Sequence, residues 1–175
     1  DYRAYNNLAE LAIKAADYAT AKNYLSRAAK LNANAAEVNT NLGMIALIEG
    51  NVADAENYLV KGTDSDANAA ALGNLYVAQG QYERAVSAFG ETKSNAAALA
   101  QIMTEQYTVA DKTLDAVETA DAYTYYLKAI VAARTNKAAA VTENLAKAVK
   151  LDGSLAEKAK KDMEFKKFAA AIANL

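Results

Sequence analysis

Apolar residues recur along this chain at the spacing of one helix face, and they do so in pairs of short segments. In residues 2–15 they fall at i, i+3, i+4 and i+7, as Tyr5, Leu8, Ala9 and Ala12. A turn at Ala16-Asp17 follows, and the next segment carries Tyr18, Ala21, Leu25 and Ala28. The pattern predicts two amphipathic α-helices joined by a tight turn.

The same pair of segments returns several times along the chain. A shift of 34 residues reproduces it as Leu42, Gly43 and Ala46, followed by Val52, Ala55 and Leu59. Later copies are Leu72, Gly73 and Tyr76 with Tyr82, Ala85 and Phe89; a weaker one at Tyr107, Ala110 and Leu114; and Tyr125, Ala129 and Ala132 with Val141, Leu145 and Ala148. A two-helix unit repeated at this length predicts an all-α solenoid of about five helical hairpins.

Composition strengthens the helical prediction. Alanine accounts for 44 of the 175 residues and proline is absent, and these are the best and the worst helix formers. Glycines stand where the helices are expected to end, at Gly50, Gly62, Gly80, Gly90 and Gly153. Small residues recur on the predicted inner faces, at Ala9, Ala21, Ala28, Ala55 and Ala85. We therefore interpret the alanine excess as a requirement for close helix packing.

These repeated columns resemble the tetratricopeptide repeat, whose pattern is W-x2-L-G-x2-Y, then A-x3-F, then P. Leu72-Gly73 with Tyr76 matches the first half, and Gly80-Gln81-Tyr82 through Ala85 to Phe89 matches the second. The tryptophan column departs from the family and holds Tyr5, Asn39, Ala69 and Tyr125. The resemblance implies a right-handed α/α superhelix in which the first helix of each hairpin lines a concave surface.

The predicted organisation is a repeat array over residues 1–153 with a C-terminal capping region over 154–175. The array divides into units of approximately 2–35, 36–65, 66–92, 93–119 and 120–153; the fourth has the weakest first helix, Asn95 to Met103. A solenoid needs a terminal element to cover its last repeat, and the candidates are Leu155, Ala159, Met163, Phe165 and Phe168. This C-terminal part also resembles envelope-associated tetratricopeptide proteins of Bacteroides-type bacteria, which implies a periplasmic or outer-membrane-associated protein; a cytoplasmic one is the alternative.

Familiar catalytic chemistry has few residues to work with. The chain contains neither histidine nor cysteine, which removes imidazole bases, thiol nucleophiles and most zinc sites. Asp64-Ser65-Asp66-Ala67-Asn68 opens like a calcium loop, but Ala69 and Leu75 stand where such a loop needs glycine and glutamate. We expect Ser65 or Asp66 to cap a helix instead. The sequence predicts no enzyme activity, no cofactor and no metal.

Charge is distributed unevenly along the chain. Residues 1–120 carry 9 Lys and Arg against 15 Asp and Glu, a net −6, whereas residues 121–175 carry 10 against 6, a net +4. An isoelectric point near 5.3 argues against nucleic-acid binding. The basic tail is interrupted by Asp162 and Glu164, so we interpret it as a solvated helix face. The longest strongly apolar stretch, 42–48, is too short to span a membrane, and the start at Asp1 without methionine is typical of a mature or truncated form.

The candidate site is a stripe beside the core on the first helix of each hairpin. It runs at i, i+3, i+7 and i+10 as Arg3, Asn6, Glu10 and Ile13; Glu37, Thr40, Met44 and Leu47; Ala67, Ala70, Asn74 and Val77; and Tyr123, Tyr126, Ile130 and Ala133. The candidate partner-binding residues are Asn6, Glu10, Thr40, Met44, Asn74, Tyr123 and Tyr126. Tyr125 belongs to the core column. Family members that clamp a C-terminal carboxylate place lysine, asparagine and arginine in these columns. Here the corresponding places hold Asn6, Glu10, Met44, Ala70 and Asn74, so a carboxylate clamp is not expected.

These features predict a non-catalytic scaffold that binds a peptide or a partner protein on the concave surface. Asparagine, methionine and tyrosine suit an extended peptide or a partner helix. Two alternatives stay open: a glycan-binding or small-ligand-binding module of the cell envelope, and an architectural or dimerisation spacer in a longer protein. The second alternative includes a homodimer.

Overall fold

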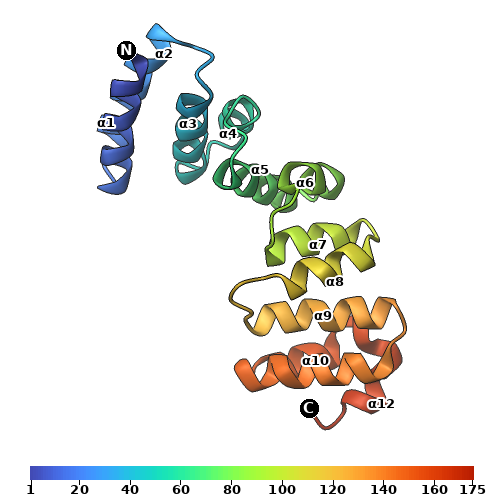
Figure 1. Ribbon diagram of the computed structural model, residues 1–175. Coiled ribbons are helices and arrows are strands. Elements are labelled where there is room, and N and C mark those ends of the chain that lie inside the picture. Colours follow the sequence, from blue (N-terminus) through green and yellow to red (C-terminus); the bar gives the residue numbers. More distant parts are fainter. The chain divides into compact units, whose positions relative to one another are not determined.

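The chain is entirely α-helical in the computed structural model, which describes residues 1–175 (Figure 1). Its helices divide into two compact units, residues 1–79 and 80–175. The first unit contains α1 (Tyr2–Lys14), α2 (Tyr18–Leu31), α3 (Ala36–Ile48), α4 (Val52–Leu59) and α5 (Asp66–Ala78). The second contains α6 (Tyr82–Phe89), α7 (Asn95–Met103), α8 (Tyr107–Asp115), α9 (Ala122–Arg134), α10 (Ala138–Leu151), α11 (Leu155–Lys161), the 3₁₀ helix η1 (Met163–Phe168) and α12 (Ala169–Ile172).

Consecutive helices pack as hairpins within each unit. In the first unit α1 packs on α2 and α3 on α4, and in the second α7 packs on α8 and α9 on α10. Outside these hairpins, α2 contacts α3 and α4 contacts α5 in the first unit, and α6 contacts α7 and α8 contacts α9 in the second. This confirms the predicted all-α architecture of paired helices. The division at Gly80 falls inside the expected unit 66–92, and no sequence signal pointed to it.

Alanine occupies the contacts between helices, as the composition predicted. Ala9, Ala21, Ala28, Ala55 and Ala85 are all fully buried. A methyl side chain lets two helix backbones approach closely, and the larger residues of the second helices fill the space between layers. Leu25, Leu59, Phe89, Leu114 and Leu145 have at most 2% of their surface exposed. Every helix is too short or too polar to cross a lipid bilayer.

The tight turns within the hairpins share one backbone geometry. A residue with positive φ precedes the second helix at Ala16, Gly50, Gly80, Glu105 and Asn136. In the first of these turns Ala16 N donates to Ile13 O, and Asp17 N donates to Ala12 O. Equivalent bonds run from Gly50 and Asn51 to Leu47 and Ala46. This is the Schellman arrangement, in which glycine fits best because it has no Cβ.

Replacing Ala16 by glycine is therefore expected to stabilise the protein by about 1 kcal/mol, because its φ of 57° is costly for an L-residue. Urea unfolding followed by circular dichroism measures the change. Ala4→Gly is the matched control: Ala4 is exposed inside α1, where glycine is expected to destabilise by about 1 kcal/mol. If both variants lose stability equally, the turn geometry has no part in the effect.

The C-terminal region covers the last hairpin of the second unit. Leu155, Ala159, Phe165, Phe168 and Ile172 join one buried cluster with residues of α9 and α10. The expectation for Met163 was wrong, because its side chain is 73% exposed. Arg134 on α9 binds this region through Glu164. Its Nη2 and Nε donate to the two carboxylate oxygens of Glu164 at 2.5 and 3.0 Å, and its Nη1 donates to Ile102 O at 3.1 Å. The ion pair raises the pKa of Arg134.

Candidate functional site

Two acidic residues of α4 and the calcium-like segment before α5 have hydrogen-bond partners within the protein. Asp54 Oδ2 accepts a hydrogen bond from Asn51 Nδ2 at 2.6 Å, and Glu56 Oε1 accepts one from the Tyr76 hydroxyl at 3.3 Å. Ser65 caps α5, with its side chain accepting from Asn68 N, as predicted for the calcium-like segment. No group of three or more acidic side chains is placed to hold a metal ion.

The predicted stripe on α1, α3 and α5 lies within the first unit, and its members differ in exposure. Glu10 and Asn74 are exposed and Met44 is half-buried, whereas Asn6 and Thr40 are only 4% and 8% exposed. Leu47, Ile13, Ala70 and Val77 add half-buried apolar surface to the same helices. We call the surface formed by Glu10, Met44, Leu47 and Asn74 the first-helix surface.

Asn6 links α1 to α3. Its Nδ2 donates to Glu10 Oε1 at 2.8 Å, and its Oδ1 accepts from Asn41 Nδ2 at 2.9 Å. Both ends of the Asn6 amide are therefore engaged within the protein. The expectation that Asn6 is available on a free groove is corrected: it holds two first helices together and fixes the side chain of Glu10.

Thr40 links α3 to the segment that precedes α5 and to α5 itself. Its hydroxyl donates to Asn68 Oδ1 at 3.1 Å and accepts from Thr63 N at 2.8 Å, while Asn68 Nδ2 donates to Leu59 O at 3.0 Å. Gly62 fits closely here, since a Cβ on it would overlap Asn68 Oδ1 and lie 2.6 Å from Thr40 Oγ1. Thr40 is therefore a packing residue, which corrects its predicted exposure.

Tyr123 and Tyr126, the two tyrosines predicted for the groove in the second unit, differ in exposure. Tyr123 is 39% exposed, and burial of the rest of its ring, with the nearby charge of Asp121, raises its pKa. Tyr126 is 2% exposed, so its predicted place on a free surface was wrong. Its hydroxyl donates to Asp162 Oδ2 at 2.6 Å, and burial together with this bond raises its pKa. Tyr125, expected in the core, is half-buried.

Asn6, Thr40 and Tyr126 occupy the same column of the stripe, and each contacts a segment that comes after its own hairpin in the sequence. Asn6 contacts α3, Thr40 contacts α5 and Tyr126 contacts the start of η1. The column is therefore a seam between successive elements. Of the predicted site residues, Glu10, Met44, Asn74 and Tyr123 keep accessible surface.

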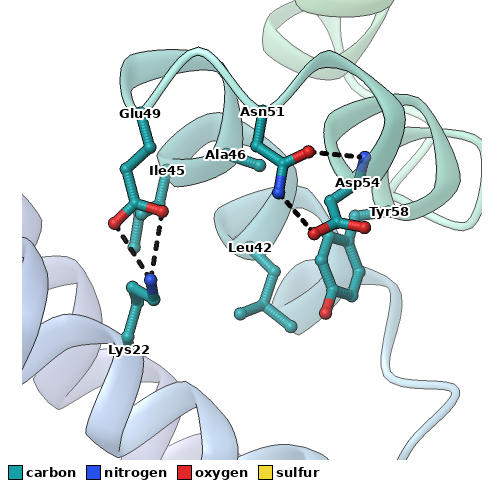
Figure 2. A pocket seen from close by; sticks show the side chains of 8 residues that line it. All are labelled: Lys22, Leu42, Ile45, Ala46, Glu49, Asn51, Asp54 and Tyr58. Atoms are coloured by element: carbon teal, nitrogen blue, oxygen red, sulfur yellow. Dashed lines mark hydrogen bonds and ion pairs between the residues drawn. The ribbon is translucent and has the colours of Figure 1, made fainter.

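A small cleft that the sequence did not reveal lies on the other side of α3 (Figure 2). Its volume is about 130 Å³, and it is lined by Lys22, Leu42, Ile45, Ala46, Glu49, Asn51, Asp54 and Tyr58. Lys22 Nζ on α2 contacts both carboxylate oxygens of Glu49 at 3.0 Å. Ligand pockets usually measure about 300–1,000 Å³, so this cleft is too small to enclose a glycan or a similar ligand. Lys22 and Glu49 are 27 residues apart in sequence, and no local pattern could have paired them.

Paired antiparallel helices, repeated Schellman turns and alanine-lined contacts define a helical-repeat protein. Residues 2–34, which contain α1 and α2, match the family model described as tetratricopeptide repeat. Tetratricopeptide repeats generally mediate protein–protein interactions, and the proteins built from them are generally non-catalytic scaffolds. A comparison with curated proteins found no match.

Proposed function

We propose that this chain is a non-catalytic scaffold that binds an extended peptide or a helix of a partner protein along the first-helix surface. The observation that carries the proposal is the position of Met44. It is half-buried on α3, with half-buried Leu47 beside it on the same helix, and α3 is hydrogen-bonded to α1 on one side and to α5 on the other. A flexible thioether in such a place suits varied apolar side chains.

The surface is held in place before any partner arrives. The Asn6 and Thr40 hydrogen bonds fix α1, α3 and α5 relative to one another, so a partner does not have to order them. Glu10 and Glu37 add negative charge beside the apolar residues, and Asn74 offers an amide. A peptide with one apolar anchor and a neighbouring basic residue matches this chemistry. We also propose that the first-helix surface is concave.

Met44→Glu is expected to weaken peptide binding by at least about tenfold, because binding would then bury an unpaired carboxylate. Peptides are selected from a displayed random library against the immobilised full chain. Their affinity for the wild-type chain and for the variant is then measured by fluorescence anisotropy. Circular dichroism checks that the helical content is unchanged.

Val60→Glu is the matched control, since Val60 is 60% exposed at the end of α4 and lies off the first-helix surface. The proposal requires Val60→Glu to bind like the wild type. Peptides that bind Met44→Glu as tightly as the wild type, or a library that yields no binder, would overturn it.

A further inference from the structure

α1 exposes an apolar stripe that no other helix of the first unit covers. Ala4, Leu8 and Leu11 stand at i, i+4 and i+7 on this helix. All three are exposed, Leu8 by 42% and Leu11 by 63%. On its other side α1 buries Ala9 and packs against α2. The helix therefore carries two apolar faces, of which one has a partner; we call the other, Ala4, Leu8 and Leu11, the α1 end stripe.

The 34-residue register of the repeat shows what covers this face elsewhere in the unit. Ala4, Leu8 and Leu11 correspond to Val38, Leu42 and Ile45 on α3. Val38 and Ile45 are each 1% exposed, and Leu42 packs against the same cluster. That cluster is completed by Leu25 and Ala28 of α2. On α3, then, the face is covered by the second helix of the preceding hairpin.

Polar contacts follow the same register. Asn41 donates to Asn6 Oδ1 of the preceding hairpin at 2.9 Å, and the residue that corresponds to Asn41 on α1 is the exposed Asn7. α5 repeats the arrangement with a shift of 30 residues from α3: Asn68 and Leu75 are buried there, and Asn68 donates to Leu59 O of α4. Two of the three first helices in this unit have this face covered by a hairpin.

We propose that the α1 end stripe docks a helical hairpin of the type that α1 and α2 form. Its second helix would present small residues beside a leucine, like Ala21, Leu25 and Ala28, which share a buried cluster with Val38 and Ile45 of α3, and its first helix would present a side-chain oxygen to Asn7. This surface is separate from the first-helix surface, and the proposal does not depend on peptide binding there. On α1 of a second copy the same stripe would present one small residue, Ala4, beside two exposed leucines, which differs from the two alanines that accompany Leu25 on α2.

A tandem chain tests the proposal. A copy of residues 1–34 is joined directly to Asp1 of the full chain, which continues the 34-residue register. The copy carries Lys14→Arg at an exposed position, so its α1 peptides that include residue 14 differ in mass from those of the original α1. Hydrogen exchange is followed by mass spectrometry on these peptides of the original α1. Docking is expected to slow exchange of these amides by about tenfold or more relative to the unextended chain, because opening α1 would then also open the new contact. Unchanged exchange would overturn the proposal.

Two variants of the tandem chain separate docking from a general effect of the extension. Leu8→Glu with Leu11→Glu, made in the original α1, is expected to return exchange to the rate of the unextended chain. Val52→Glu, at an exposed position on α4, is expected to keep the protection. Protection that survives the double change overturns the assignment to this stripe. Light scattering on the unextended chain tests the other occupant: a dimer that Leu11→Glu dissociates would show that the stripe binds a second copy instead.

Discussion

Replacing Phe165 by alanine is expected to lower the free energy of unfolding by about 3–5 kcal/mol. The ring is fully buried and meets Tyr126 edge to face, with the ring centroids 5.4 Å apart and an interplanar angle of 83°. Removing it opens a cavity between η1 and α9 and removes the aromatic contact as well. Urea unfolding followed by circular dichroism measures the loss.

Met163→Ala is the matched control, because Met163 lies in the same 3₁₀ helix but is 73% exposed. Its expected effect is within about 0.5 kcal/mol of zero. Equal effects of the two changes would contradict the packing of η1 on the last hairpin. Because Tyr126 also donates to Asp162 at the start of η1, hydrogen exchange in α9 should rise in Phe165→Ala and stay unchanged in Met163→Ala.

Sequence periodicity predicted the hairpins well because helix propensity and packing point in the same direction here. Alanine favours the helix and also permits close approach, so Ala21 and Ala28 mark both a helix and its buried face. The Ala16-Asp17 turn was equally clear from the break between two amphipathic segments. These are local signals, and each one lies within a single hairpin.

The exposure of Tyr126 and Thr40 could not be predicted in the same way. Their burial depends on segments later in the chain, through Asp162 and Asn68 respectively. A helical period identifies which residues share a face, but it does not say how much of that face a neighbouring hairpin covers. From the sequence alone, a polar side chain buried between two successive elements cannot be told apart from one exposed in a groove.

The predicted burial of Met163 was wrong for a different reason, which is the type of helix in which Met163 lies. An α-helix that continued from Ala159 would place Met163, four residues later, on the same buried face. α11 instead ends at Lys161, and Asp162 is extended, with φ −73° and ψ 127°. The following 3₁₀ helix repeats every three residues. It therefore buries Phe165 and Phe168 and leaves Met163 outside.

Gly43 on α3 lies too close to Leu59 of α4 to leave room for a side chain, and alanine there is expected to destabilise the protein by about 1–3 kcal/mol. A Cβ at Gly43 would lie 2.6 Å from Cγ and 2.7 Å from Cδ2 of Leu59. Leu59 is 1% exposed, so it has no free space to move into. Gly153→Ala is the control: a Cβ there meets nothing within 4 Å, and the change is expected to be close to neutral.

A double-mutant cycle tests whether this loss arises from the contact with Leu59. Leu59→Ala alone is expected to cost about 2–5 kcal/mol through the cavity it leaves. In the double variant the new methyl group occupies part of that cavity, so the combined loss should fall short of the sum by about 0.5–3 kcal/mol. Strict additivity would mean that Gly43 is required by its own helix. A shortfall would show that it is required because α3 and α4 approach too closely for any side chain, which is the same reason for which alanine lines the other hairpins.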